Sequence, residues 1–437
     1  MGELIYLPAI GPTDLSISGF SRRMMEDWGI THNFLNKEKS IYYYPYFLIS
    51  AHYGKDLFNM RKQFGLNNCK IIMGDSGGFQ NVTLDANLDP LEVLRWQENN
   101  CTHGLILDQP PFENQKGSAM FGRASDKTFR DSLRITKNNA IVALTKRNKM
   151  SPFKLYGVIQ GDDEKRKHLW FDEMKKLERE YGEFDGWALS PKPSYDIQQI
   201  AHHAVLILIE KINKPIHILQ ITGYETLAMA AYISTLHDNI VTVDSSSFAA
   251  GRRYMSYTDP MTITQKMLLG RDNNTIKLTD WPCMCPVCSK IPYSAFEREY
   301  EQGEKTVPGM ILSLHNLYQT IAYTKWLNVI KNDKAYFRKF AKREFGQRFI
   351  DTLNYIDEAL VVGHDKSWRK NIIKNSSLNK FFGEQKVSTP STDDGLSDVV
   401  VKRLADLRED YLDVNDDILY KLYRHKYGSD PIGKQTL

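Results

Sequence analysis

Residues 70–80 read KIIMGDSGGFQ, a short apolar run that stops at Asp75 and is followed by a serine, two glycines, an aromatic residue and a glutamine. The apolar run is typical of a buried β-strand. Glycine is favoured where a chain turns sharply or where its backbone lies against another group. The stretch therefore predicts a strand that ends in a carboxylate, followed either by a sharp turn or by a close backbone approach.

The same unit, an apolar run with a polar end and then a helix-like stretch, recurs along the chain. Six such runs end at Asp75, Asp108, Gln160, Ser190, Thr222 and Asp244. Stretches of helical periodicity lie between them, at residues 89–100, 126–148, 162–182 and 195–213. Weaker apolar runs at residues 3–7 and 45–50 raise the count of strands to eight. Apolar strands that alternate with helices indicate an α/β fold with a parallel sheet, and eight of them favour a (β/α)8 TIM barrel over an open doubly wound sheet.

The polar residues at the ends of the runs are candidates for a common site. In a barrel the carboxyl ends of all strands surround one pocket. Asp75, Asp108, Gln160 and Asp244 are therefore expected to converge, although they lie far apart in the sequence. The alternative for each residue alone is that it caps the following helix.

The composition is that of a soluble globular protein. The 437 residues are 42% hydrophobic and 25% charged, and the formal net charge of +4 argues only weakly for a polyanionic partner. Apolar stretches stay shorter than the roughly 18 residues of a membrane helix, and the first residues lack the pattern of a signal peptide. We expect a cytoplasmic protein.

Three of the five cysteines form a candidate metal site. Cys283, Cys285 and Cys288 are spaced C-x-C-x2-C, which suits one ion better than a disulfide framework. Zn2+ is the usual occupant of a sulfur-rich tetrahedral site, and His315 is the leading fourth ligand. The alternative for His315 is a core histidine on a helix. A complete Cys3His set leaves no open coordination position, so the zinc is expected to be structural.

The changes of pattern predict three regions. Residues 1–280 are expected to form the catalytic barrel, and residues 281–350 an inserted or appended zinc-binding subdomain with a basic helix that completes the barrel. A helical C-terminal extension, residues 351–437, is expected to contain a polar linker near residues 376–395.

The motifs together resemble the tRNA-guanine transglycosylase superfamily, which includes the queuine and archaeosine tRNA-ribosyltransferases. The resemblance spans residues 65–330. It rests on DSGGFQ (75–80), the aspartate of LILDQP, GVIQG (157–161), FDGWAL (184–189), the aspartate of VTVDSS, and CMCPVC with the later histidine. Members are zinc-bearing (β/α)8 barrels that exchange guanine in a polynucleotide for a 7-deazaguanine base. The resemblance thus implies a pentosyltransferase.

The resemblance also implies roles for single residues. Asp244 matches the nucleophile that forms a covalent glycosyl-enzyme, and Asp75 the general acid and base. An Asx-turn is the alternative for Asp75. The residues that match the substrate pocket are Ser76, Phe79, Gln80, Asp108, Gln160 and Gly161. Within this set, Asp108 and Gln160 would read the purine edge and Phe79 would stack on its face, while Gly77 and Gly78 would let the backbone approach.

Departures from the tRNA enzymes favour the DNA-modifying branch, the DNA-guanine transglycosylases of bacteriophages and bacterial modification islands. Ser190, Pro191 and Lys192 replace a Gly-Gly-Leu turn, and Gln220 replaces a methionine that packs under the base. Of the anticodon-gripping stretch only Arg252 and Arg253 remain, and we expect them to contact the nucleic-acid backbone. The expected partners are DNA, with its target guanine flipped out or single-stranded, and a free 7-deazaguanine such as the cyano or aminomethyl form. A viral protein of this kind would act in the host cytoplasm.

Several alternatives remain at this stage. The chain could instead modify tRNA, could be a non-catalytic partner subunit, or could be an unrelated barrel nucleosidase. Relatives dimerise, so a homodimer is one alternative for the assembly. The segment 331–348 holds seven Lys and Arg against two acids with aromatic residues between them, which predicts either a phosphate-binding helix or a solvated face over a core stripe.

Overall fold

The computed structural model describes residues 2–11, 27–29, 31, 33–54, 59–84, 86–113, 122–191, 196–221, 223–249, 251, 254–260, 266–268, 280–301 and 306–363. Two compact units divide the chain. The barrel unit takes its described residues from Met1–Met25, Ile30–Ser247 and Thr324–Asp365, and the second unit takes them from Glu26–Gly29 and Phe248–Tyr323. Arg252, Arg253 and the predicted linker at 376–395 lie outside the described residues.

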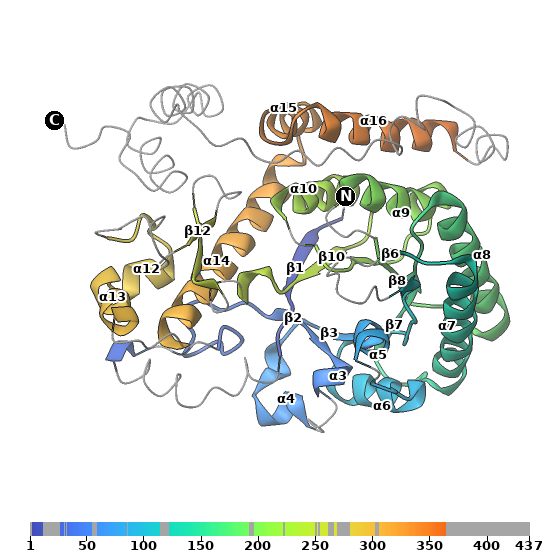
Figure 1. Cartoon of the computed structure of the whole chain (residues 1–437), viewed down its shortest axis with the longest axis horizontal. Coiled ribbons are helices and arrows are strands. Elements are labelled where there is room, and N and C mark those ends of the chain that lie inside the picture. Colours follow the sequence, from blue (N-terminus) through green and yellow to red (C-terminus); the bar gives the residue numbers. More distant parts are fainter. Residues whose placement is uncertain are drawn as a thin grey trace. The chain divides into compact units, whose positions relative to one another are not determined.

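Eight parallel strands form a nearly closed barrel (Figure 1). The strands are β1 (Leu4–Pro8), β2 (Tyr46–Ser50), β3 (Ile71–Asp75), β4 (His103–Leu105), β7 (Lys154–Ile159), β8 (Gly186–Leu189), β9 (Ile216–Ile218) and β10 (Val241–Ser245). Their order in the sheet is β1-β10-β9-β8-β7-β4-β3-β2. The two ends of this order meet where the Ile10 N–H donates to the Leu48 carbonyl at 2.9 Å. The predicted (β/α)8 barrel is confirmed at this level, including the two weaker strands.

Helices surround the strands, as the alternating sequence pattern predicts (Figure 1). The long ones are α6 (Pro90–Asn100), α7 (Asp126–Lys146), α8 (Glu164–Tyr181), α9 (Ile197–Ile209) and α10 (Tyr224–Thr235). Side-chain caps fix where several of them begin. Asp89 accepts from the backbone N–H groups of Leu91 and Glu92, and Asp163 accepts from that of Arg166, each at 2.9 Å. The four predicted helices are confirmed, with ends that differ by a few residues.

Shorter elements connect the strands and long helices of the barrel. They are α3 (Ala51–Gly54), α4 (Met60–Gln63), the 3-10 turn η1 (Leu66–Asn68), α5 (Gly78–Thr83), and the antiparallel pair β5 (Phe112–Glu113) and β6 (Gly122–Arg123).

Aromatic side chains fill the layer between sheet and helices. Trp187 on β8 packs edge-on against Phe171 and Phe184, with ring centroids 5.3 and 5.4 Å apart. A Cβ at Gly157 would lie 2.7 Å from the Phe184 ring, so this strand position has room only for glycine.

The chain returns to the barrel unit through three C-terminal helices. They are α14 (Thr306–Ile330), of which residues from Thr324 onward belong to this unit, α15 (Lys334–Phe345) and α16 (Gln347–Val362). The Asn328 side chain accepts from the Leu4 N–H at 3.0 Å and donates to the Leu4 carbonyl at 2.8 Å. Lys331 Nζ donates to the Gly2 carbonyl and to Ser234 Oγ, both at 2.7 Å. These bonds attach the end of α14 to the strand that begins the barrel.

Two of the aromatic residues of the basic segment, Phe337 and Phe340, belong to the core. Phe337 and Phe340 on α15 are only 1% and 6% exposed. Phe337 stacks on Tyr232 with ring centroids 5.9 Å apart. Phe340 packs edge-on against Trp326 with ring centroids 4.7 Å apart. These two side chains therefore fit the core-stripe alternative and are not available to stack on bases.

The second unit contains the predicted cysteine cluster. Its elements are the 3-10 turn η2 (Ser247–Ala249), β11 (Ser256–Thr258), β12 (Lys266–Leu268), α12 (Pro286–Lys290), α13 (Tyr293–Glu301) and α14 up to Tyr323. Asn316 on α14 donates to the Ser256 carbonyl at 2.8 Å and accepts from the Thr258 N–H at 2.7 Å. The side chain of Asn316 thereby fixes β11 against the helix. Across the described residues of both units, every helix is too short or too polar to span a membrane.

Replacing Lys331 by alanine should destabilise the barrel unit. The Gly2 carbonyl and the Ser234 hydroxyl would both lose a buried donor, which should lower the free energy of unfolding by about 1–3 kcal/mol. Urea denaturation followed by circular dichroism measures the change. Lys334→Ala, which removes an exposed lysine three residues further on, is the control, and equal stability of the two variants would contradict the assignment.

Candidate active site and metal centre

Three aspartates meet at the carboxyl ends of the barrel strands. Asp75 is the last residue of β3, Asp108 follows β4, and Asp244 lies in β10. Burial raises the pKa of Asp75 to about 6, and the charges of Asp108 and Asp244 add to the effect. A carboxyl group with such a pKa carries a proton near neutral pH far more often than an ordinary aspartate does. The structure therefore brings together the carboxylates that the strand ends predicted to converge.

Asp108 sits at the centre of a small polar network. Gln160 Nε2 donates to Asp108 Oδ2 at 2.5 Å, and Ser76 Oγ donates to Oδ1 at 3.2 Å. All three side chains are buried. Within the described part of the chain, Gln160 Oε1 and Gln80 Oε1 are buried acceptors that no donor reaches. A ligand that brings an N–H group to either oxygen could satisfy it.

The glycine turn explains how β3 reaches Asp108. Gly77 has φ of 80°, in the left-handed region, and its N–H donates to Asp75 Oδ2 at 3.3 Å. This is the Asx-turn that was the alternative for Asp75. A Cβ at Gly78 would lie 2.3 Å from the Asp108 carbonyl oxygen. The turn and the close backbone approach are therefore both present, and the group approached is Asp108. Phe79 follows on α5 and is half-buried.

Asp244 is held by the loop that follows β9. The Gln220 N–H donates to Asp244 Oδ1 at 2.9 Å, and Gln220 adopts a left-handed φ of 60°. His217 Nε2 lies 3.4 Å from the same oxygen, while its Nδ1 lies 2.9 Å from Thr242 Oγ1. His217 is fully buried. The sequence analysis missed it, although a histidine within the apolar run IHILQ was a visible signal.

Tyr6 on β1 is a second neighbour of Asp244 that the sequence analysis did not identify. Its hydroxyl donates to the Ser245 carbonyl at 2.9 Å. Burial raises the pKa of Tyr6 well above its ordinary value, and the charge of Asp244 raises it further. Tyr6 therefore stays neutral and acts as a hydrogen-bond donor beside the carboxylate.

Gly161 and the residues that follow β8 are held by backbone geometry. Gly161 has φ of 141°, and a Cβ there would lie 2.8 Å from the backbone nitrogen of Lys167. Ser190 and Pro191 are buried at the end of β8, where the Ser190 N–H donates to the Ile159 carbonyl at 3.0 Å. Lys192 lies outside the described residues.

This arrangement suits chemistry that needs two carboxylates in different states. One is partly protonated near neutral pH and can move a proton, as Asp75 is. The other is oriented by a backbone N–H, as Asp244 is. Pairs of acids with different environments carry out general acid–base and nucleophilic steps at sugar carbons.

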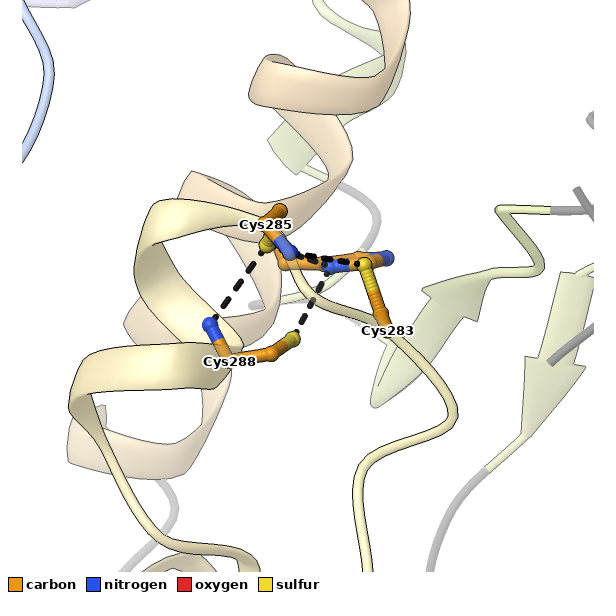
Figure 2. Close-up of side chains that lie close together, drawn as sticks. Cys283, Cys285 and Cys288 are labelled. Carbon is orange, nitrogen blue, oxygen red and sulfur yellow. Dashed lines mark hydrogen bonds between the residues drawn. The ribbon is translucent and has the colours of Figure 1, made fainter. Parts of the chain in front are cut away.

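Cys283, Cys285, Cys288 and His315 form a buried cluster in the second unit. Figure 2 shows the three cysteines gathered around the start of α12. The candidate ligand atoms of all four residues lie within 4.8 Å of one another. His315 Nδ1 is 3.4 Å from Cys285 Sγ and 3.3 Å from Cys288 Sγ. The cluster could bind a metal ion such as zinc, because three sulfurs and one imidazole nitrogen are its preferred ligands.

The surroundings of the cluster orient its ligands. His315 Nε2 donates to the Thr258 carbonyl at 2.8 Å, which leaves Nδ1 facing the sulfurs. The Tyr257 ring stacks on the imidazole with centroids 4.0 Å apart. Further N–H groups point at sulfur: Cys285 N to Cys283 Sγ at 3.3 Å and Cys288 N to Cys285 Sγ at 3.4 Å (Figure 2). Gln319 Nε2 also donates to Cys283 Sγ, at 3.2 Å. Such bonds stabilise thiolates, which are the form that binds metal.

No protein-family model matches the chain, and no curated protein matches it in a sequence search. The function is therefore argued from the geometry of the site and from the motifs that build it.

Removing the charge of Asp108 should lower the pKa of Asp75. In Asp108→Asn the pKa should fall from about 6 by about one unit, and it should stay above the ordinary 3.8 because burial is the largest cause of the shift. Carbon-13 NMR of labelled aspartate side chains measures the titration. Asp172→Asn, on the exposed face of α8, should leave the titration in place, and a pKa near 4 for Asp75 in the unmodified protein would contradict the argument.

Of the five cysteines, only the three in the cluster should be needed to bind zinc. Cys288→Ser should lose about one equivalent of bound zinc per chain, because one of four ligands is lost. Elemental analysis of purified protein gives the ratio. Cys69→Ser changes another buried cysteine, which lies in the barrel unit, and should retain the ion. Equal zinc content in the two variants would refute the assignment.

Proposed function

We propose that the protein is a base-exchange transglycosylase that replaces guanine in DNA with a 7-deazaguanine derivative. The observation that carries the proposal is the meeting of Asp75, Asp108 and Asp244 at one end of the barrel, with a raised pKa at Asp75. The order of the motifs along the chain, from DSGGFQ to CMCPVC, supports the same function.

Asp244 and Asp75 have different roles in the proposed reaction. A carboxylate oxygen of Asp244 attacks C1′ of the target nucleotide, the bond from C1′ to guanine N9 breaks, and its electron pair moves onto the base. Asp75 supplies the proton that neutralises the departing guanine. The incoming 7-deazaguanine loses its N9 proton to Asp75 and attacks C1′, which releases Asp244. Both steps conserve atoms and electrons, and no external oxidant or reductant is needed.

The Asp108 network recognises the base. Asp108 accepts hydrogen bonds from Gln160 and Ser76, and the buried Oε1 of Gln160 remains an acceptor for a base N–H. A guanine edge offers adjacent N–H donors, which match a carboxylate beside an amide oxygen. Phe79 would cover the purine, and Gln80 and Gly161 would line the same pocket.

The cysteine cluster supplies structure in this proposal. Cys283, Cys285, Cys288 and His315 would hold one Zn2+ ion and make the second unit a zinc-binding subdomain. The ion would stabilise the fold of that unit, because four protein ligands complete its tetrahedral coordination.

DNA is the proposed polymer, and tRNA is the second candidate. Attack of Asp244 on C1′ does not require the 2′-hydroxyl that distinguishes RNA from DNA. In a duplex, the target guanine would have to be flipped out of the stack. Arg252 and Arg253, eight and nine residues after Asp244 in the sequence, are the proposed backbone contacts.

Incubation with radiolabelled 7-deazaguanine bases and with guanine, separately with duplex DNA, single-stranded DNA and tRNA, tests the proposal. We expect label to enter DNA. Label in tRNA alone would reject the choice of polymer, and no label in any nucleic acid would favour a non-catalytic partner subunit.

Asp244→Ala should abolish exchange, by at least about 10³-fold, because the covalent intermediate can no longer form. Denaturing electrophoresis should show a protein–DNA adduct with the unmodified protein and none with the variant. Asp172→Ala, a surface carboxylate on α8, is the matched control and should keep both exchange and adduct. Full activity of Asp244→Ala would refute the assignment of the nucleophile.

A further inference from the structure

A second group of metal-ligating side chains lies on the outer helical layer of the barrel unit and shares no residue with the cysteine cluster. Glu164 and His168 are one turn apart on α8, so they share one face of that helix. His202 faces them from the neighbouring helix α9. One ligand atom from each of the three residues lies within 4.8 Å of the others, and Glu164 Oε1 is 4.0 Å from His202 Nε2.

The donor set has a defined chemical preference. Two imidazole nitrogens and one carboxylate oxygen suit Zn2+, Ni2+, Co2+ or Fe2+ better than Mg2+ or Ca2+, which prefer oxygen ligands. Metal–ligand bonds of about 2.1 Å place tetrahedral ligands about 3.4 Å apart. The observed separation of 4.0 Å needs only a small rotation of side chains to reach that geometry.

Packing holds His202 in the orientation that such a site requires. Its side chain is 4% exposed, and its ring contacts the rings of His168 and Tyr355, with centroids 6.1 and 6.4 Å away. Lys167 Nζ lies 3.3 Å from His202 Nδ1 and also donates to Gln199 Oε1. Lys167 therefore occupies one edge of the imidazole, and Nε2 on the opposite edge is directed at Glu164.

The site is open to solvent on one side. The Glu164 side chain is 20% exposed, so an ion can enter without unfolding of the helices. Three protein ligands leave at least one coordination position for water or another ligand. This distinguishes the group from the closed four-ligand cluster of the second unit.

We infer that Glu164, His168 and His202 form a site for a divalent transition-metal ion that links α8 to α9. The ion would connect the first two turns of the helices that follow β7 and β8. Gln160 directly follows β7 and lies four residues before α8 begins, so the ion would stabilise the part of the barrel wall that presents Gln160. The inference stands on this geometry alone and holds whatever the protein acts on.

Cobalt titration of the full chain, free of any histidine tag and loaded with one equivalent of zinc so that the four-ligand cluster is filled first, tests the inference. We expect one equivalent of Co2+ to bind with weak visible d–d bands and without the intense near-ultraviolet absorption of sulfur ligands. Glu164→Gln, His168→Gln and His202→Gln should each weaken this binding at least about tenfold. Zinc at the cysteine cluster should remain in all three variants.

Glu180→Gln is the matched control, because it removes an exposed carboxylate further along α8. It should bind Co2+ as the unmodified protein does. Glu164→Gln keeps the inference testable if a buried histidine variant fails to fold, since Glu164 is partly exposed and the change conserves volume. Absence of the bound Co2+ from the unmodified protein, or equal affinity in Glu164→Gln and Glu180→Gln, would overturn the inference.

Discussion

The barrel unit is organised around the burial of three like-charged side chains at one end of its sheet. Desolvation disfavours the ionised form of Asp75, and the charges of Asp108 and Asp244 add to the effect. The structure meets this cost in two ways. Asp75 takes on a proton more readily than an ordinary carboxyl group, and Asp108 and Asp244 receive hydrogen bonds from Gln160 and from the Gln220 backbone.

The backbone conformation next to the three aspartates is adapted to their positions. Gly78 has no room for a side chain because the Asp108 carbonyl occupies the space, and Gln220 adopts a left-handed conformation to aim its N–H at Asp244. A non-glycine residue with positive φ carries a strain that must be offset by its surroundings, and such residues concentrate at functional sites. The hydrogen bond from the Gln220 N–H to Asp244 therefore accounts for the left-handed conformation of Gln220 better than its side chain does.

The sequence was sufficient for the architecture because the barrel repeats one local pattern eight times. Each apolar run with a polar end became a strand, and even the weak runs at 3–7 and 45–50 became β1 and β2. The convergence of strand-end carboxylates followed from barrel geometry alone. His217 and Tyr6 were missed because their proximity to Asp244 depends on the register between neighbouring strands, which no local pattern reports. The bonds from Asn328 and Lys331 to the first strand were missed for the same reason, since more than 300 positions separate the partners.

The two metal-ligand groups differ in a way that bears on what each ion could do. The Cys3His cluster offers four buried ligands, enough to complete a tetrahedral shell, and hydrogen bonds orient His315 and the sulfur of Cys283. An ion there has no position for substrate, so its contribution is to the stability of the second unit. The group of Glu164, His168 and His202 supplies only three ligands and is partly exposed, so an ion there could exchange with solvent. Neither group shares a residue with the three aspartates. In the proposed reaction the carboxylates would carry out the chemistry, and an ion at either group would stabilise the unit that holds it.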